Sequence, residues 1–432
     1  MSLDRRQFTG LLAGMIAGSA YRPDSAAADG ASPAPVTDPC HLPPQLASLK
    51  PMLDGVQPIT AAERERRIER ARQLMVAQGV GAILLEPGTN MTYFTKVRWG
   101  QSERPFVALL PAEGEMAFVC PGFEEARARE SIPAGAEVRV WQEDESPYAV
   151  IAGILRDRGL ATGTIGVEAE TRYFISNGVQ TEAPAATYRN ADPVTVGCRS
   201  IKSPAELALM QRASDITVAA FGAAFATLEA GMSQYDLSEN MTTAMRLLGG
   251  TSPWALVGFG EASAFPHGTS RPQKLAEGDI VLLDAGCAVQ GYQSDITRTT
   301  VYGTPTARQT EIWNLERRAQ DAAFAAAQPG ATCGSVDAAA RKVITDAGFG
   351  PGYALPGLPH RTGHGIGMDG HEAPNFVKGS EVIIQPGMCF SDEPNISIYG
   401  EFGIRLEDCI YVTESGPRFF AQQAPAIDRP FP

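Results

Sequence analysis

The fold is best predicted from residues 280–299, which read IVLLDAGCAVQGYQSDITRT. Each half is a β-type run that carries one aspartate, Asp284 in the first half and Asp295 in the second. A carboxylate within an apolar strand is costly unless it is paired or bound to a metal. A symmetric hairpin centred between Val289 and Gln290 places Asp284 directly opposite Asp295, with Cβ atoms about 4.5–5.5 Å apart. Two carboxylates that close repel each other unless a cation lies between them or one is protonated.

A second hairpin of the same kind is predicted from residues 388–412, which read MCFSDEPNISIYGEFGIRLEDCIYV. A hairpin centred on Gly400 brings Glu393 opposite Glu407, and Arg405 lies beside Glu407 on the same face. One pair of facing carboxylates is consistent with an acid/base dyad or with an accident of structure. Two such pairs in one chain indicate a site for two metal ions.

Histidines complete the predicted site. The chain has five, and His360, His364 and His371 fall within residues 359–372, PHRTGHGIGMDGHE. The glycines of this stretch exclude a regular helix and allow the backbone to bend close to a ligand. A lone histidine is more often a packing residue, whereas a cluster among glycines favours a site. A phosphate-binding loop is disfavoured because the chain has no GxxxxGK[ST] motif.

Four carboxylates and one imidazole form an oxygen-rich ligand set. Manganese, iron or cobalt suits such a set better than a structural zinc. Two metal ions close together share a bridging water, lower its pKa and polarise the carbonyl that it attacks. The sequence therefore predicts hydrolysis of an amide or an ester.

The composition argues against several classes of partner and of metal site. The net charge of -13 argues against nucleic acid as the main partner and against an anionic membrane surface. The seven cysteines form no CxxC pair, which argues against a disulfide framework and a thiolate zinc site. Cys287, Cys389 and Cys409 lie in apolar runs and are predicted to be buried free thiols.

The N-terminus predicts export. Arg5 and Arg6 precede a short apolar run at residues 11–20, a pattern that resembles a twin-arginine signal. The run is too short to span a bilayer, which needs about 20 apolar residues. An uncleaved anchor or an ordinary Sec signal is the alternative. We therefore expect a periplasmic or secreted protein without stable membrane association after processing.

The rest of the chain predicts two folded units. Strand and helix alternate between about residues 60 and 195, which is typical of an α/β domain. A second unit begins near Ser203, where Pro204 and Glu206 occupy the positions of a capping box. Long Ala-rich helices follow, with apolar β-type runs between and after them.

These motifs together resemble the pita-bread metallopeptidases, the group of aminopeptidase P, prolidase and methionine aminopeptidase. The resemblance covers about residues 200–420, and the preceding domain resembles the creatinase-like domain of the proline-specific members. It implies an α/β N-terminal domain and an α+β pita-bread catalytic domain. The expected boundaries are an export signal at 1–28, a linker at 29–58, the creatinase-like domain at 59–198 and the dinuclear metallopeptidase domain at 199–432.

The resemblance also implies a role for each site residue. Asp295 and Glu407 would bridge both metal ions, Asp284 would bind one, and His364 with Glu393 would bind the other. Glu393 would also carry the proton of the attacking water. The residues implied to face the substrate or to support the ligands are His267 on the substrate side, His371 at the scissile carbonyl, His360 at the proline pocket, and Arg405 beside Glu407 or at the substrate carboxylate.

The implied activity is cleavage of the bond before proline by an Xaa-Pro aminopeptidase with two divalent ions, manganese first and cobalt, iron or zinc as alternatives. A prolidase that splits Xaa-Pro dipeptides is the main alternative. A creatinase-like hydrolase or lyase and a silent peptide-binding module are less favoured because every ligand position is filled. The run Pro394-Asn395-Ile396 and the short interval from Glu393 to Glu407 depart from the family pattern and leave the substrate open. A homodimer or homotetramer is expected from the resemblance alone.

Overall fold

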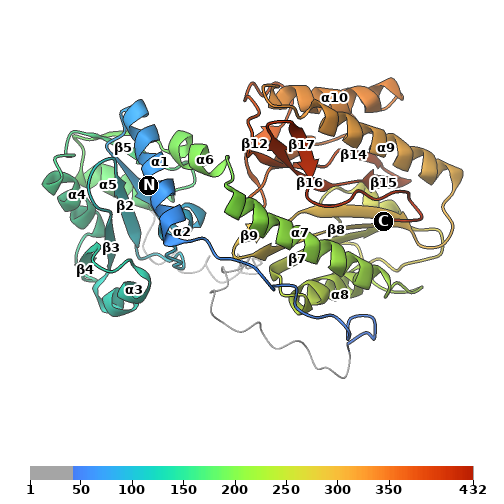
Figure 1. Cartoon of the computed structure of the whole chain (residues 1–432), viewed down its shortest axis with the longest axis horizontal. Helices are drawn as coiled ribbons and strands as arrows, with labels where there is room; N and C mark the ends of the chain where they lie inside the picture. Colours follow the sequence, from blue (N-terminus) through green and yellow to red (C-terminus); the bar gives the residue numbers. More distant parts are fainter. Residues whose placement is uncertain (1–41, 432) are drawn as a thin grey trace, which may run out of the picture. The chain divides into compact units, whose positions relative to one another are not determined.

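The computed structural model describes residues 42–431. The predicted export signal and Cys40 lie outside this range, as does the first part of the predicted linker. Figure 1 shows the order of the elements along the chain.

The first folded unit is built on a six-stranded mixed sheet of order β4-β3-β2-β1-β5-β6. Its strands are short, and β1, β2 and β3 are buried because their apolar runs supply both faces of the sheet. The strands are β1 (Ala82–Leu85), β2 (Val107–Pro111), β3 (Ala117–Pro121), β4 (Glu137–Trp141), β5 (Thr164–Val167) and β6 (Thr187–Asn190). The helices are α1 (Ala61–Gln78), α2 (Thr89–Thr95), α3 (Glu125–Ser131), α4 (Pro147–Asp157), α5 (Tyr173–Glu182) and α6 (Asp192–Arg199), with a 3-10 turn η2 (Gly122–Glu124).

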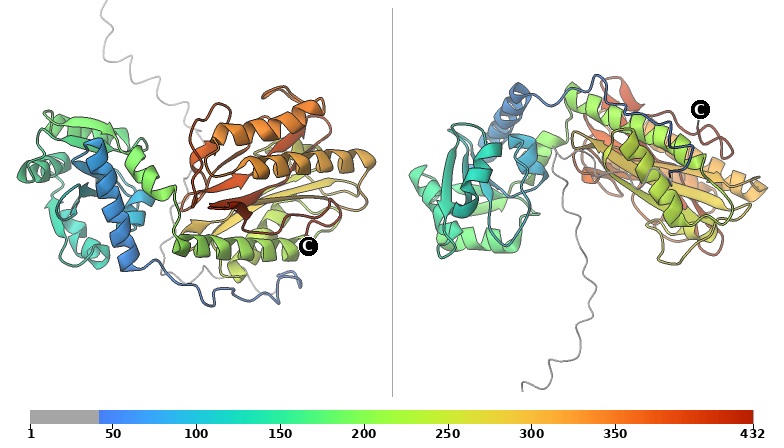
Figure 2. Two further views of the ribbon diagram at one scale, coloured as in Figure 1. Left: turned by 45° about the horizontal axis from the view of Figure 1, so that its top comes forward. Right: turned by 90° about the horizontal axis from the view of Figure 1, so that it is seen from below.

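The second unit has two helix pairs with the strands between them (Figures 1 and 2). The predicted capping box is present, with Ser203 accepting from the amide of Glu206 and Glu206 accepting from the amide of Ser203. The helices are α7 (Pro204–Phe225), α8 (Gln234–Leu247), α9 (Ala307–Ala326) and α10 (Cys333–Asp346), with a 3-10 turn η3 (Gly260–Ala264). α7 and α8 pack on β7 (Thr251–Phe259) and β8 (Ile280–Val289), and α9 and α10 pack on the later strands.

The strands of this unit form three sheets. β7 and β8 join β9 (Tyr292–Gln293) and β10 (Ile296–Val301) in the first sheet. The second sheet has the order β12-β11-β13-β16-β17, and β14 pairs with β15 alone. Their bounds are β11 (Gly363–Gly365), β12 (Glu372–Phe376), β13 (Cys389–Asp392), β14 (Asn395–Ile398), β15 (Phe402–Arg405), β16 (Asp408–Thr413) and β17 (Gly416–Phe419).

The predicted register of the first hairpin is wrong by two residues. Asp284 pairs with Thr297 rather than with Asp295. The turn consists of Gln290 and Gly291, both at positive φ (53° and 85°), as a tight two-residue hairpin requires. This moves the centre of the hairpin one residue along the chain. Because side chains alternate with a period of two, a two-residue shift leaves Asp284 and Asp295 on the same face.

The predicted register of the second hairpin is correct, but the strands are interrupted. Asp392 pairs with Asp408 and Asn395 pairs with Arg405, so Glu393 and Glu407 lie at facing positions between two paired segments. The amide of Glu393 instead donates to the carbonyl of Thr362, and the amide of Glu407 donates to the carbonyl of Thr297. The second strand of this hairpin is therefore divided in two, because its backbone bonds to Thr297 of β10 at Glu407.

The apolar residues form separate cores in the two units. The three thiols predicted to be buried lie in one core of the second unit. Cys287, Cys389 and Cys409 are buried and free, as expected. No helix between residues 42 and 431 is long and apolar enough to cross a membrane.

Glu316 is a buried carboxyl on the side of α9 that faces the strands. One turn later, Gln320 donates to the carbonyl of Asp392 and to the carboxylate of Asp408. Glu316 is 0% exposed, and neither of its carboxyl oxygens has a hydrogen-bond partner among the described residues. Burial raises the pKa of Glu316 well above its ordinary value of 4.5. The folded state therefore holds this proton more tightly than the unfolded chain, and its contribution to stability is lost as the pH rises above the unfolded pKa.

We expect Glu316→Gln to raise the midpoint of thermal unfolding by about 1–4 °C at pH 8, because glutamine has no charge to bury. At pH 5 the midpoint should change little, since the native carboxyl is then neutral as well. Circular dichroism melts at both pH values measure this. Glu311→Gln, on the exposed side of the same helix, is the control. A stabilisation that is equal at the two pH values contradicts the prediction.

Candidate metal centre

Five side chains that the sequence analysis singled out lie together. Ligand atoms of Asp284, Asp295 and Glu407 all lie within 4.8 Å of one another, and so do those of His364, Glu393 and Glu407. Glu407 belongs to both groups and connects them. Asp295, His364 and Glu407 are at most 4% exposed. The carboxylates of Asp284 and Glu393 are slightly more accessible.

The residues present fit divalent metal ions. Oδ1 of Asp284 and Oδ1 of Asp295 are buried and have no hydrogen-bond partner in residues 42–431. Burial, and then repulsion from Asp284 and Glu393, raises the pKa of Asp295 well above its ordinary range. Burial and the charge of Asp295 do the same to the pKa of Glu407. Divalent ions among these oxygens would satisfy the orphaned atoms and favour the ionised forms.

The tautomer of His364 also fits a metal. Nδ1 of His364 lies 3.0 Å from the carbonyl oxygen of Gly365. A carbonyl only accepts, so Nδ1 carries the proton and Nε2 is the nitrogen that faces the carboxylates. Nε2 lies 3.0 Å from Oε1 of Glu393 and 3.7 Å from Oδ2 of Asp295. A neutral ring in this tautomer offers its Nε2 lone pair to a metal ion.

Two hydroxyl groups that the sequence analysis missed orient the carboxylates. Thr297 donates to Oε2 of Glu407 at 2.6 Å. Ser391 donates to Oε1 of Glu393 at 3.0 Å and accepts from the amide of His364 at 2.9 Å. Each hydroxyl lies two residues from a predicted site carboxylate along the chain. The period-two alternation of side chains is the signal that would have found both of them.

Arg405 lies behind the carboxylates and is 3% exposed. It forms an ion pair with Asp284, donates to Oγ1 of Thr297 at 3.0 Å, and donates to the carbonyl of Pro266 at 2.9 Å. Its Nε is 3.7 Å from Oε2 of Glu407. Of the two roles that the resemblance implied, the structure favours support of the carboxylates over contact with the substrate.

The three other predicted histidines lie around these groups. The His371 ring lies against the His364 ring, with centroids 4.0 Å apart. Burial, followed by the nearby His364, lowers the pKa of His371 to about 4, so the ring is neutral at pH 7. Burial also lowers the pKa of His360, whose Nε2 has no hydrogen-bond partner in the described part of the chain.

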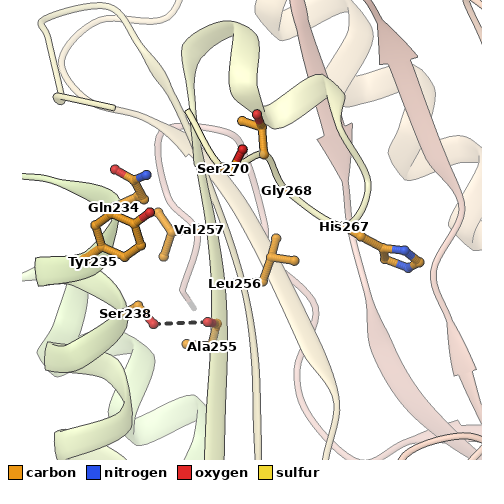
Figure 3. A pocket seen from close by; sticks show the side chains of 10 residues that line it. Gln234, Tyr235, Ser238, Ala255, Leu256, Val257, His267, Gly268 and Ser270 are labelled. Carbon is orange, nitrogen blue, oxygen red and sulfur yellow. Dashed lines mark hydrogen bonds between the residues drawn. The ribbon is translucent and has the colours of Figure 1, made fainter. Parts of the chain in front are cut away.

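His267 follows η3 and lines a cavity of about 330 Å³ between α8 and β7. Its imidazole points away from the other residues of that cavity, as Figure 3 shows. Tyr235, Ser238 and Leu256 are among the other residues that line the cavity. The dashed line in Figure 3 marks the hydrogen bond from Ser238 to the carbonyl of Ala255 at 3.0 Å.

Glu393 differs electrostatically from the other carboxylates. Burial opposes its ionised form, but the hydrogen bond and charge that His364 supplies when its ring is protonated, with the charges of protonated His360 and of Arg405, outweigh burial and hold the pKa of Glu393 well below its ordinary value. An ionised carboxylate at the accessible side of the site is suited to accept a proton.

Comparisons with known proteins agree with this site. The chain is 33% identical over 339 residues to the Xaa-Pro dipeptidase of Lactobacillus helveticus, a match that covers 77% of this chain and 90% of that protein. Residues 208–414 match the model of metallopeptidase family M24, and residues 67–201 match the creatinase/prolidase N-terminal domain. The chain belongs to metallopeptidase family M24. The predicted combination of a creatinase-like domain and a pita-bread domain is therefore confirmed.

Solved structures of this family have the same fold. The dipeptidase PepE from Mycobacterium ulcerans superposes with a TM-score of 0.79 at 32% identity, over 85% of this chain and 97% of that one. The X-Pro aminopeptidase from Thermotoga maritima superposes with a TM-score of 0.69 at 24% identity, over 82% of this chain and 97% of that one. At that identity the second match shows the fold alone. The protein is a metallopeptidase, and membership of the family implies divalent metal ions and a peptide substrate.

We expect Thr297→Val to weaken metal binding by about 10–100-fold, because Glu407 and Arg405 both lose the hydroxyl that orients them. Calorimetric titration of the metal-depleted protein with Mn²⁺ measures the affinity. Thr242→Val, on α8, is the control, because among residues 42–431 the Thr242 hydroxyl bonds only to the carbonyl of Glu239. An unchanged affinity in Thr297→Val would show that this hydroxyl does not orient a ligand.

Proposed function

We propose that this protein is an Xaa-Pro dipeptidase that hydrolyses the bond before proline in dipeptides. The observation that carries the proposal is the similarity to proteins named dipeptidases at 32–33% identity over nearly their whole length. The aminopeptidase that acts on longer Xaa-Pro peptides, our first expectation from the sequence, has weaker support. The X-Pro aminopeptidase from Thermotoga maritima is only 24% identical to this chain.

We propose that Asp284, Asp295, His364, Glu393 and Glu407 hold two divalent ions. When bound, the ions would activate the attacking water and polarise the scissile carbonyl. Manganese is the proposed metal, because four of the five side chains are carboxylates. Arg405 and Thr297 keep the carboxylates in place from behind.

In this mechanism, Glu393 accepts the proton of the attacking water, since its depressed pKa keeps it ionised at neutral pH. The same carboxyl then delivers the proton to the proline nitrogen as the peptide bond breaks. His371 hydrogen-bonds the oxygen of the scissile carbonyl, where negative charge develops. His360 borders the proline ring, and His267 lies on the same substrate side.

Three further properties are proposed on sequence grounds. Export by a twin-arginine signal to the periplasm or beyond rests on Arg5, Arg6 and the short apolar run after them. A homodimer or homotetramer rests on the family resemblance. The domain boundaries at 28, 58 and 198 rest on composition and motif positions.

A peptide-length series tests the proposed function. We expect the metal-loaded protein to cleave Ala-Pro and Leu-Pro with kcat/KM at least about ten-fold above that for Ala-Pro-Ala, a difference of about 1.4 kcal/mol in transition-state binding. Reconstitution with Mn²⁺, Co²⁺ and Zn²⁺ in parallel identifies the active metal, and chromatography of the products measures the rates.

Asp295→Ala is the control for this series and should be inactive, with a reduced metal content. Faster cleavage of the tripeptide would favour the aminopeptidase. If the metal-loaded protein cleaves neither peptide, the proposed proline-specific function is wrong.

A further inference from the structure

Three of the histidines near the proposed centre, His360, His364 and His371, have hydrogen-bond partners that fix their tautomers. Nδ1 of His360 lies 2.6 Å from the carbonyl oxygen of Arg361. A carbonyl oxygen only accepts, so this Nδ1 carries the proton, as Nδ1 of His364 does. In the neutral form of both rings, Nε2 is then left with a lone pair.

His371 has the opposite arrangement. Its Nδ1 lies 3.2 Å from Nη2 of Arg361. A guanidinium has donors and no acceptor, so Nδ1 must accept the hydrogen bond. With Nδ1 accepting, a neutral His371 ring has its single proton on Nε2. Arg361 thus uses its carbonyl to hold one histidine tautomer and its side chain to hold the other.

We propose that Arg361 is a positioning residue that fixes His371 as the Nε2–H tautomer, so that His371 can donate a hydrogen bond to the scissile carbonyl oxygen. The proposal rests on the proposed function, because that function supplies the carbonyl. A donor aimed at the developing negative charge stabilises the transition state. The other tautomer would present a lone pair to that oxygen and repel it.

The position of His371 suits this task. One of its ring nitrogens lies within 4.8 Å of ligand atoms of Asp295 and His364, so the ring borders the proposed metal centre. The ring is also partly exposed, which leaves it accessible to a peptide.

The contacts of Arg361 differ from those of a structural arginine. In the described part of the chain, the side chain of Arg361 has His371 as its hydrogen-bond partner and forms no ion pair with a carboxylate. Arg341, by contrast, pairs with Asp337 and donates to the carbonyls of Gly352 and Leu358, and so fastens the segment before His360. Removing the Arg361 side chain should therefore leave the fold intact.

Nitrogen NMR of the metal-depleted full chain tests the tautomer directly. The chain has only five histidines, and His371→Asn assigns the His371 signals by difference. In the wild type, Nδ1 of His371 should have the shift of an unprotonated nitrogen and Nε2 that of a protonated one. Arg361→Met should move both shifts toward the average of two tautomers, whereas Arg361→Lys, which keeps a donor, should retain the wild-type shifts.

Kinetics of the metal-loaded enzyme test the consequence. We expect Arg361→Met to lower kcat on an Xaa-Pro dipeptide by about ten-fold, less than the roughly 10²–10³-fold that follows outright removal of an oxyanion donor. The KM should stay within about two-fold of the wild-type value, and Arg361→Lys should restore most of kcat. Metal content and the melting midpoint should not change. Arg418→Met, on the exposed side of β17, is the matched control.

Three results would overturn the proposal. Wild-type nitrogen shifts in Arg361→Met would show that another group fixes the tautomer. A raised KM with unchanged kcat would show that Arg361 instead binds the substrate carboxylate. Failure of Arg361→Lys to restore either the shifts or kcat would exclude the hydrogen bond as the cause. If the wild type cleaves no Xaa-Pro peptide, the proposed function fails, and the NMR comparison still decides whether Arg361 sets the tautomer.

Discussion

The rest of the structure depends on the repulsion between carboxylates that the fold buries side by side. Asp284, Asp295 and Glu407 have oxygens within 4.8 Å of one another in a place from which water is almost excluded. Such a group is stable only where positive charge and hydrogen-bond donors compensate for lost hydration. Arg405 and Thr297 supply part of that compensation from one side. The remaining unpartnered oxygens are what the divalent ions of this family would satisfy.

The cluster of carboxylates lies where the hydrogen-bond pairing of two strands is interrupted. Glu393 and Glu407 are facing positions of one hairpin, yet their amides bond to the carbonyls of Thr362, just before β11, and of Thr297 in β10. The pairing of the two strands is therefore interrupted at the carboxylates. Ser391 and Thr297 lie against these carboxylates and orient them through hydrogen bonds.

The sequence predicted which side chains gather but not all of the geometry that gathers them. The spacing around Gly400 gave the correct register for Glu393 and Glu407, because a symmetric turn is the simplest solution and the chain adopts it. The same argument misplaced the partner of Asp284, because positive φ values at Gln290 and Gly291 moved the turn by one residue. The error did not change the prediction that Asp284 and Asp295 lie on the same face of the sheet, since a shift of two residues preserves the alternation of side chains between the two faces.

Taken alone, the sequence determined the chemical class of the protein: the ligand types, their pairing on hairpins and the resemblance to pita-bread metallopeptidases. These follow from residue identity and local spacing, which the fold cannot change. Only the tertiary structure decided the hydrogen bonds between segments distant in the chain, from Arg405 to Thr297 and from Thr297 to Glu407. It also decided the opposite tautomers on the two sides of Arg361, because a tautomer depends on which atom lies next to each nitrogen. No pattern of residue types specifies that neighbour.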